Sequence, residues 1–202
     1  MRETLEPLGV IDFCGGQETN KSKLWQHAPA YEAKRNFSEN GLDWDLYFKY
    51  VVVRNPWDRY LSFLNYYKTE AYNYKENREK LSEPAIIQGE MASSIFDSHK
   101  TLSDVMLYFA KMQGGIWESQ EYYINDKSGN QIVDYIGDFD NINEEFYFFC
   151  KKSGIKDTLK LKHSNKSVKK IDPNNVFTQE IIDLIAKKEN YVINLMNYQP
   201  PK

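Results

Sequence analysis

The chain has 202 residues, of which 41% are hydrophobic, 15% aromatic and 27% charged, and its formal net charge is -3. This length suits a single domain over residues 1–202 with a sizeable core, and the aromatic content argues against intrinsic disorder. The acidic balance excludes a chain that is basic over its whole surface, so we expect no nucleic-acid partner. We also expect no transmembrane segment, because no apolar run approaches the length of a membrane span.

The first predicted elements form half of an α/β unit. Val10–Cys14 predicts a short strand that ends at two glycines. Leu46–Val53 ends in a β-branched apolar run, which is typical of a buried strand in a largely parallel sheet. Asn55 then suits a helix N-cap and Pro56 the first helical position. The helix that follows has one apolar and one more polar face: Trp57, Tyr60, Leu61, Leu64 and Tyr67 on the first, Asp58, Ser62, Asn65 and Thr69 on the second.

The rest of the chain alternates between helices and short strands. Residues from about Tyr72 to Ser98 are polar and weakly periodic, which predicts a helix end followed by a mobile excursion. The later predicted elements are a capped helix over Thr101–Met112, a strand over Ile132–Ile136 after the turn Asp126–Asn130, a helix over Asn143–Ser153, a short strand at Leu159–Leu161, and a long helix that Thr178 caps and that continues to about Met196.

Two cysteines, Cys14 and Cys150, are too few for a disulfide framework and have no metal-ligand spacing. Isolated thiols of this kind are most often core residues.

Arg54 is the first candidate binding residue, because it follows a buried strand directly and precedes a helix N-terminus. Ligands of open α/β sheets sit beyond the carboxyl ends of the strands, and helix N-termini favour anions. Ser62 lies six residues beyond Pro56, about 9 Å along the helix axis, so an arginine and a hydroxyl could share one phosphate. In the alternative interpretation, Arg54 and Arg59 pair with nearby carboxylates and Ser62 is a tolerated helix serine.

Residues 47–62, YFKYVVVRNPWDRYLS, resemble the 3′-phosphate-binding segment of the sulfotransferases. The likeness is greatest to the carbohydrate and heparan sulfate branch, which has the pattern VRNPxDRxxS. The resemblance implies that Arg54 and Ser62 bind the 3′-phosphate of 3′-phosphoadenosine 5′-phosphosulfate (PAPS), and that Arg59 supports that site.

Weaker matches extend the resemblance. Residues 117–120 (WESQ) resemble a WxPQ segment, and residues 133–141 resemble DYIGRFENL, with Asp138 where the family prefers arginine. Residues 163–167 resemble an HxNxS loop, in which Lys166 and Ser167 either contact the cofactor or belong to a solvated loop.

Sulfuryl transfer needs in-line positioning, charge neutralisation and a base for the acceptor hydroxyl, and no metal is required. His27 is our candidate base, because the related sulfotransferases carry an HxxA element before the central strand. A packing role for His27 beside Trp25 is the alternative.

The family's PKTGTTS-like loop for the 5′-phosphosulfate has no counterpart here, and residues 1–8 resemble the helix that follows it. We therefore expect a chain that lacks the first strand of the fold. A non-catalytic nucleotide- or glycan-binding remnant is one alternative. A small-molecule kinase is the other, since residues 15–22 (GGQETNKS) approximate a Walker A loop in which Asn20 replaces the second glycine.

The sequence thus predicts an α/β fold with a central parallel sheet flanked by helices, of the P-loop nucleotide-hydrolase-like sulfotransferase type. The expected reaction moves a sulfuryl group from PAPS to a hydroxyl, of a carbohydrate or another acceptor. The expected location is the cytoplasm or another soluble compartment, with the Golgi as the alternative if a longer protein carries an anchor.

Overall fold

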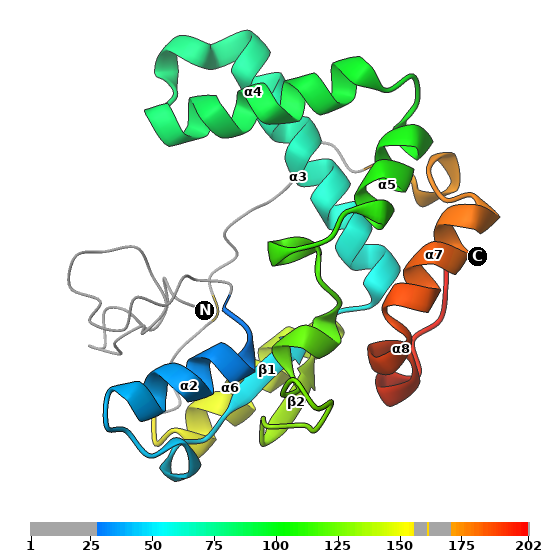
Figure 1. Ribbon diagram of the computed structural model, residues 1–202. Coiled ribbons are helices and arrows are strands. Elements are labelled where there is room, and N and C mark those ends of the chain that lie inside the picture. Colours follow the sequence, from blue (N-terminus) through cyan, green and yellow to red (C-terminus); the bar gives the residue numbers. More distant parts are fainter. Residues whose placement is uncertain (1–27, 156–160, 162–170, 202) are drawn as a thin grey trace. The chain divides into compact units, whose positions relative to one another are not determined.

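The computed structural model describes residues 28–155, 161 and 171–201, which fall into two compact units. The first unit contains residues 28–54, 118–155 and 161, and the second contains residues 55–117 and 171–201. The chain leaves the first unit after Arg54 and returns to it after Trp117. Figure 1 shows that helices dominate the described residues and that the strands are few.

The first unit contains a two-stranded parallel sheet, which agrees with the predicted α/β class. Strands β1 (Tyr50–Val53) and β2 (Tyr135–Asp138) pair in register, with Tyr50 opposite Tyr135 and Val53 opposite Asp138. Helix α2 (Ala30–Glu39) precedes β1, and helix α6 (Ile142–Lys152) follows β2 and packs against it. Parallel pairing needs a long connection, and here it consists of the whole of residues 54–134.

The predicted strand over Leu46–Val53 is too long by four residues. Trp44–Leu46 forms a 3-10 turn instead, because the Asp43 carboxylate accepts a hydrogen bond from the Asp45 amide at its start. The predicted strand over Ile132–Ile136 is likewise displaced, since β2 begins only at Tyr135. The turn Asp126–Asn130 is present, and it is closed by the bridge between Asn125 and Gln131.

A small aromatic core covers the sheet. The ring of Tyr50 stacks on that of Tyr135 with centroids 5.6 Å apart. The buried pair Phe146 and Cys150 of α6 forms a second cluster, against which Phe149, Ile155 and Leu161 pack. The prediction that an isolated thiol is a core residue is therefore confirmed for Cys150.

Helix α3 (Pro56–Asn77) begins where the sequence predicts. The Asn55 side chain accepts a hydrogen bond from the Trp57 amide at 3.1 Å, and Pro56 is the first helical residue. The buried side chains of α3 are Pro56, Trp57, Tyr60, Leu64, Asn65, Tyr67 and Ala71. The sequence places Asn65 on the more polar face, but the residue is buried. Its burial is tolerated because its oxygen accepts a hydrogen bond from the Ile171 amide and its nitrogen donates one to the Leu61 carbonyl.

Of the prediction over Tyr72–Ser98, the helix end is confirmed and the mobile excursion is wrong. Helix α3 continues to Asn77, and helix α4 (Glu83–Ser98) packs along it. The two helices lie close together at Gly89, since a Cβ atom there would lie 2.7 Å from Cβ of Tyr74. The buried residues of α4 are mostly small, so the segment lacks the apolar periodicity that identifies an amphipathic helix.

Helix α5 (Leu102–Lys111) matches the prediction and starts with a capping box between Thr101 and Asp104. The single long helix expected after Thr178 is instead two helices, α7 (Gln179–Lys188) and α8 (Asn190–Met196). They are interrupted at Glu189, whose side chain is fully buried.

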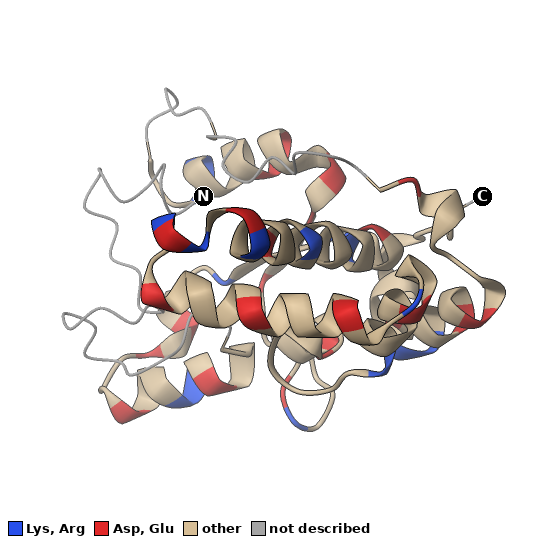
Figure 2. Cartoon of the chain, turned by 90° about the horizontal axis from the view of Figure 1, so that it is seen from above, with Lys and Arg blue, Asp and Glu red and all other residues tan. Residues whose placement is uncertain are grey.

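The predicted strand Val10–Cys14 lies outside the described residues, and so do residues 159 and 160. Leu161 is described and is not in a strand. Acidic and basic residues are interspersed along the described helices (Figure 2). None of the helices within the described ranges combines the length and apolar character that crossing a bilayer requires.

Candidate functional site

The carboxyl ends of β1 and β2 meet at one edge of the sheet, and Arg54 lies there. Val53 and Asp138, the last residues of the two strands, are paired. Arg54 follows Val53, and Phe139 follows Asp138. The guanidinium carbon of Arg54 lies 4.7 Å from the centroid of the Phe139 ring, close enough for a cation–π interaction. The structure therefore places Arg54 at the sheet edge where ligands of α/β folds bind.

Gln120 holds the backbone of Arg54 from both sides. Its side-chain oxygen accepts a hydrogen bond from the Arg54 amide at 2.8 Å, and its side-chain nitrogen donates to the Arg54 carbonyl at 2.9 Å. Gln120 is itself buried. These two bonds continue the hydrogen bonding of β1 by one residue and fix the point from which the arginine side chain extends.

The role of Gln120 could not be read from the sequence. Gln120 belongs to the segment 117–120, which resembles a WxPQ pattern, but that pattern says nothing of its partner, which lies 66 residues earlier.

Asp138 brings a carboxylate to the same edge, at the position where the sulfotransferase pattern that this segment resembles has an arginine. Its amide donates to Glu145, and one of its carboxylate oxygens accepts the amide of Asp140. Beneath it, a Cβ atom on Gly137 would lie 2.6 Å from a Glu145 oxygen and 2.9 Å from the Tyr50 hydroxyl. Burial is the main cause of a raised pKa at Tyr50, and the nearby Glu145 carboxylate raises it further, so this tyrosine stays protonated.

Ser62, the second predicted phosphate ligand, lies on α3 in the second unit and is half-buried. Within the described residues its hydroxyl has no hydrogen-bond partner. The N-terminus of this helix is held within the second unit, since the Asn55 side chain donates to the Gln199 carbonyl and the Trp57 indole donates to the Ile182 carbonyl.

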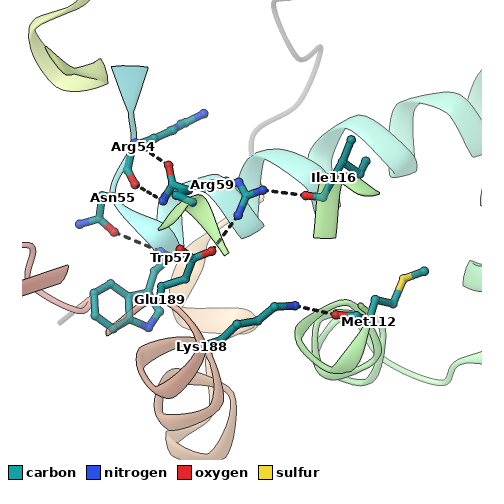
Figure 3. Close-up of polar contacts among 9 residues, drawn as sticks. Arg54, Asn55, Trp57, Arg59, Met112, Ile116, Lys188 and Glu189 are labelled. Atoms are coloured by element: carbon teal, nitrogen blue, oxygen red, sulfur yellow. Dashed lines mark hydrogen bonds and ion pairs between the residues drawn. The ribbon is translucent and has the colours of Figure 1, made fainter. Parts of the chain in front are cut away.

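Arg59, the third predicted site residue, is bound to other groups of the protein (Figure 3). One of its guanidinium nitrogens lies 2.7 Å from a carboxylate oxygen of Glu189, and another donates to the Ile116 carbonyl at 2.6 Å. The Arg59 side chain is 13% exposed and that of Glu189 is 0% exposed. The neighbouring Lys188 donates to the Met112 carbonyl, so this part of the second unit forms a small polar network.

The remaining predicted site residues, His27, Lys166 and Ser167, lie outside the described residues, as does the Walker A-like segment 15–22. Among the residues that the structure describes, it thus places Arg54 at the sheet edge, Ser62 on α3 and Arg59 in a buried ion pair.

Comparison with known proteins adds no assignment: no family model, no curated protein and no solved structure matches the chain.

Proposed function

We propose that the protein is a sulfotransferase that transfers a sulfuryl group from PAPS to a hydroxyl group of a carbohydrate. The observation that carries this proposal is the position of Arg54, held by Gln120 at the carboxyl ends of two parallel strands. The sulfotransferase-like segment 47–62 requires a strand that ends at this arginine and a helix that starts directly after it. β1 and α3 satisfy both requirements.

The donors in this segment suit a phosphate group. A guanidinium offers several N–H donors and a permanent positive charge, and a serine hydroxyl can donate one further bond. Arg54 is the residue that we expect to carry most of the affinity for the 3′-phosphate, and the motif assigns Ser62 as its second ligand. PAPS, when bound, would supply the sulfuryl group, and its 5′-phosphate would be the leaving group.

Arg54 would neutralise the 3′-phosphate and so fix the direction in which the cofactor enters. His27 is the proposed base, which takes the proton of the acceptor hydroxyl as the new oxygen–sulfur bond forms and the bond from sulfur to the departing phosphate breaks. In this proposal Arg59 acts on the site only indirectly, by anchoring α3.

Calorimetric titration with 3′-phosphoadenosine 5′-phosphate, adenosine 5′-phosphate and ATP tests the proposal. We expect the 3′-phosphorylated nucleotide to bind at least about tenfold more tightly than the other two, because it alone offers a 3′-phosphate for a charged hydrogen bond. Arg54→Ala should abolish that preference. Arg35→Ala removes an exposed arginine of α2 that pairs with Glu39, and as the matched control it should leave the preference unchanged.

Two results would contradict the proposal. ATP binding that is tight and insensitive to Arg54 would favour a kinase-like protein. A preference for the 3′-phosphate with no transfer of labelled sulfur from PAPS, tested over a panel of sugars, would identify the remnant alternative.

A further inference from the structure

Phe139 is an exposed aromatic residue that lies beside Arg54 at the sheet edge. The parallel register pairs Val53 with Asp138, so Arg54 and Phe139, the next residue of each segment, leave the sheet at the same level. The guanidinium carbon of Arg54 lies over the Phe139 ring, 4.7 Å from its centroid. Both residues belong to the first unit, so their contact forms within that unit.

The backbone around Phe139 is held on both sides. One carboxylate oxygen of Asp138 accepts a hydrogen bond from the Asp140 amide at 3.1 Å, which starts the short 3-10 turn at this point. The Phe139 carbonyl accepts a hydrogen bond from the Ile142 amide, and the Asp138 amide donates to Glu145 of α6 at 3.1 Å. The backbone that carries the ring is thus tied both to the end of β2 and to α6.

The ring of Phe139 is not part of the buried core. Phe139 is 42% exposed, whereas Phe146 of the same unit is 2% exposed. Burial of apolar surface therefore explains much less of the position of Phe139 than it does for a core phenylalanine. The feature that distinguishes this ring is the positive charge that lies over its face.

The contact with the ring affects how Arg54 can bind a ligand. A cation–π contact restrains an arginine without supplying an acceptor to its N–H groups, so the same guanidinium can bind an oxyanion. A side chain that is already restrained loses less conformational freedom when it binds. Arg54 is restrained at two points, at its backbone by the two hydrogen bonds from Gln120 and at its guanidinium by Phe139.

We infer that Phe139 is a positioning residue, which holds the Arg54 guanidinium in place for the 3′-phosphate of the nucleotide. This inference rests on the proposed function for the identity of the ligand. It adds that the ring strengthens binding only through the arginine and does not contact the nucleotide itself. The effect of the ring should therefore be confined to nucleotides that carry a 3′-phosphate.

Calorimetric titration of the full chain with 3′-phosphoadenosine 5′-phosphate and with adenosine 5′-phosphate tests the inference in Phe139→Leu. This variant keeps an apolar side chain but has no aromatic face. It should bind the 3′-phosphorylated nucleotide about twofold to fivefold more weakly, which is the usual effect of an exposed cation–π contact. Its affinity for adenosine 5′-phosphate should not change. Phe139→Tyr keeps the aromatic face and should have the affinity of the parent protein.

A double-mutant cycle with Arg54→Ala shows whether the ring acts through the arginine. In the Arg54→Ala background, Phe139→Leu should have no further effect on the affinity for 3′-phosphoadenosine 5′-phosphate. Tyr147→Leu is the matched control, because it removes an exposed ring of α6 in the same unit. It should leave the affinity for both nucleotides unchanged.

Two results would overturn the inference while the proposed function stands. The first is an affinity for the 3′-phosphorylated nucleotide that Arg54→Ala lowers and Phe139→Leu does not. The second is a loss in Phe139→Leu that affects both nucleotides equally or persists in the Arg54→Ala background, because the ring would then contact the base or support the fold. An affinity that Arg54→Ala itself leaves unchanged would contradict the proposed function, and the inference with it.

Discussion

Two arginines of one motif, Arg54 and Arg59, have different surroundings although they are five residues apart. The backbone of Arg54 is held by two hydrogen bonds from Gln120, and its side chain lies against the ring of Phe139 at the sheet edge. Arg59 is held by its side chain, through Glu189 and the Ile116 carbonyl. The first arrangement suits binding to a ligand, whereas the second suits a structural role. Replacement of Arg54 should therefore lower the affinity for the ligand, and replacement of Arg59 should lower the stability of the fold.

Replacement of Arg59 by methionine should lower the free energy of unfolding by about 3–5 kcal/mol, because the fully buried Glu189 carboxylate loses its charged partner. The double variant Arg59→Met with Glu189→Met should recover much of that loss, since it leaves no buried charge unpaired. Urea denaturation measures both. A single variant as stable as Arg35→Met, which removes only an exposed ion pair, would contradict this account.

Replacement of Gln120 by alanine should weaken the affinity for 3′-phosphoadenosine 5′-phosphate, because the Arg54 backbone loses both bonds that hold it at the end of β1. The loss should be smaller than that of Arg54→Ala, since the guanidinium remains. Calorimetry on the two variants gives the comparison. An unchanged affinity in Gln120→Ala would show that the two hydrogen bonds from Gln120 do not position the arginine.

At the scale of elements, the amino ends of the two strands are tied together by Lys49 and Asp134. The Lys49 amide donates to the Asp134 carboxylate at 2.8 Å, and the Lys49 ammonium lies 3.0 Å from the same oxygen. In return the amides of Asp134 and Tyr135 donate to the Lys49 carbonyl. The parallel pairing therefore starts from this Lys49–Asp134 clasp, an ion pair with hydrogen bonds just before both strands.

This clasp predicts a pH-dependent contribution to stability. The Lys49 amide, followed by its ammonium, lowers the pKa of Asp134 in the folded protein. The stabilisation is present above the pKa of about 3.9 of an unfolded aspartate and is lost as the pH falls through the lower folded value. Asp134→Asn should thus reduce the urea midpoint at pH 7 and reduce it less near pH 2. A difference that stays constant between the two pH values would refute the assignment.

Gly89 allows α4 to lie close to α3, and this contact gives a second prediction for elements. Gly89→Ala adds a methyl group 2.7 Å from Cβ of Tyr74 and 3.1 Å from the Glu70 carbonyl. Because one of these neighbours is backbone and the other a Cβ atom, the overpacking should cost about 2–3 kcal/mol, which exceeds the gain of about 1 kcal/mol in helix propensity. We expect a net loss of stability in thermal denaturation. The exposed neighbour Glu90→Ala is the control, and equal stability of the two variants would exclude a tight contact.

The elements that sequence reasoning predicts well are those whose signals are local. The start of α3 follows from Asn55 and Pro56, and α5 follows from its capping box. Helix α4 was missed because its buried face consists mainly of small residues, which give no apolar period. The break between α7 and α8 was missed for a different reason: the buried Glu189 at that point is paired with Arg59, a long-range contact that no local pattern records.

The same distinction holds for the candidate site. Arg54 could be placed at the sheet edge because a strand, a cap and a proline surround it. Gln120 could not be assigned to it, because their contact joins positions 66 residues apart.

For the whole molecule, the division into two units leads us to expect that they differ in local stability. Each unit has its own buried residues: Ile124, Val133, Phe146 and Cys150 in the first, and Tyr60, Leu64, Met106, Phe109 and Ile185 in the second. Local opening of a protein follows such cooperative groups.

Arg59→Met should therefore accelerate hydrogen exchange in α3, α5 and α7 more than in α6. Amide exchange followed by mass spectrometry on peptides from each helix measures the difference. Equal acceleration in α6 and in the helices of the second unit would show that the described residues unfold as one body.

The Arg59–Glu189 pair has a consequence for synthesis on the ribosome. The two residues are 130 positions apart, so at about 5–20 residues per second the carboxylate is made on the order of ten seconds after the guanidinium. During that interval, the nascent chain carries Arg59 without the carboxylate of Glu189. The pair can close only after Glu189 has been translated, so the segment of α3 stays without this ion pair until then.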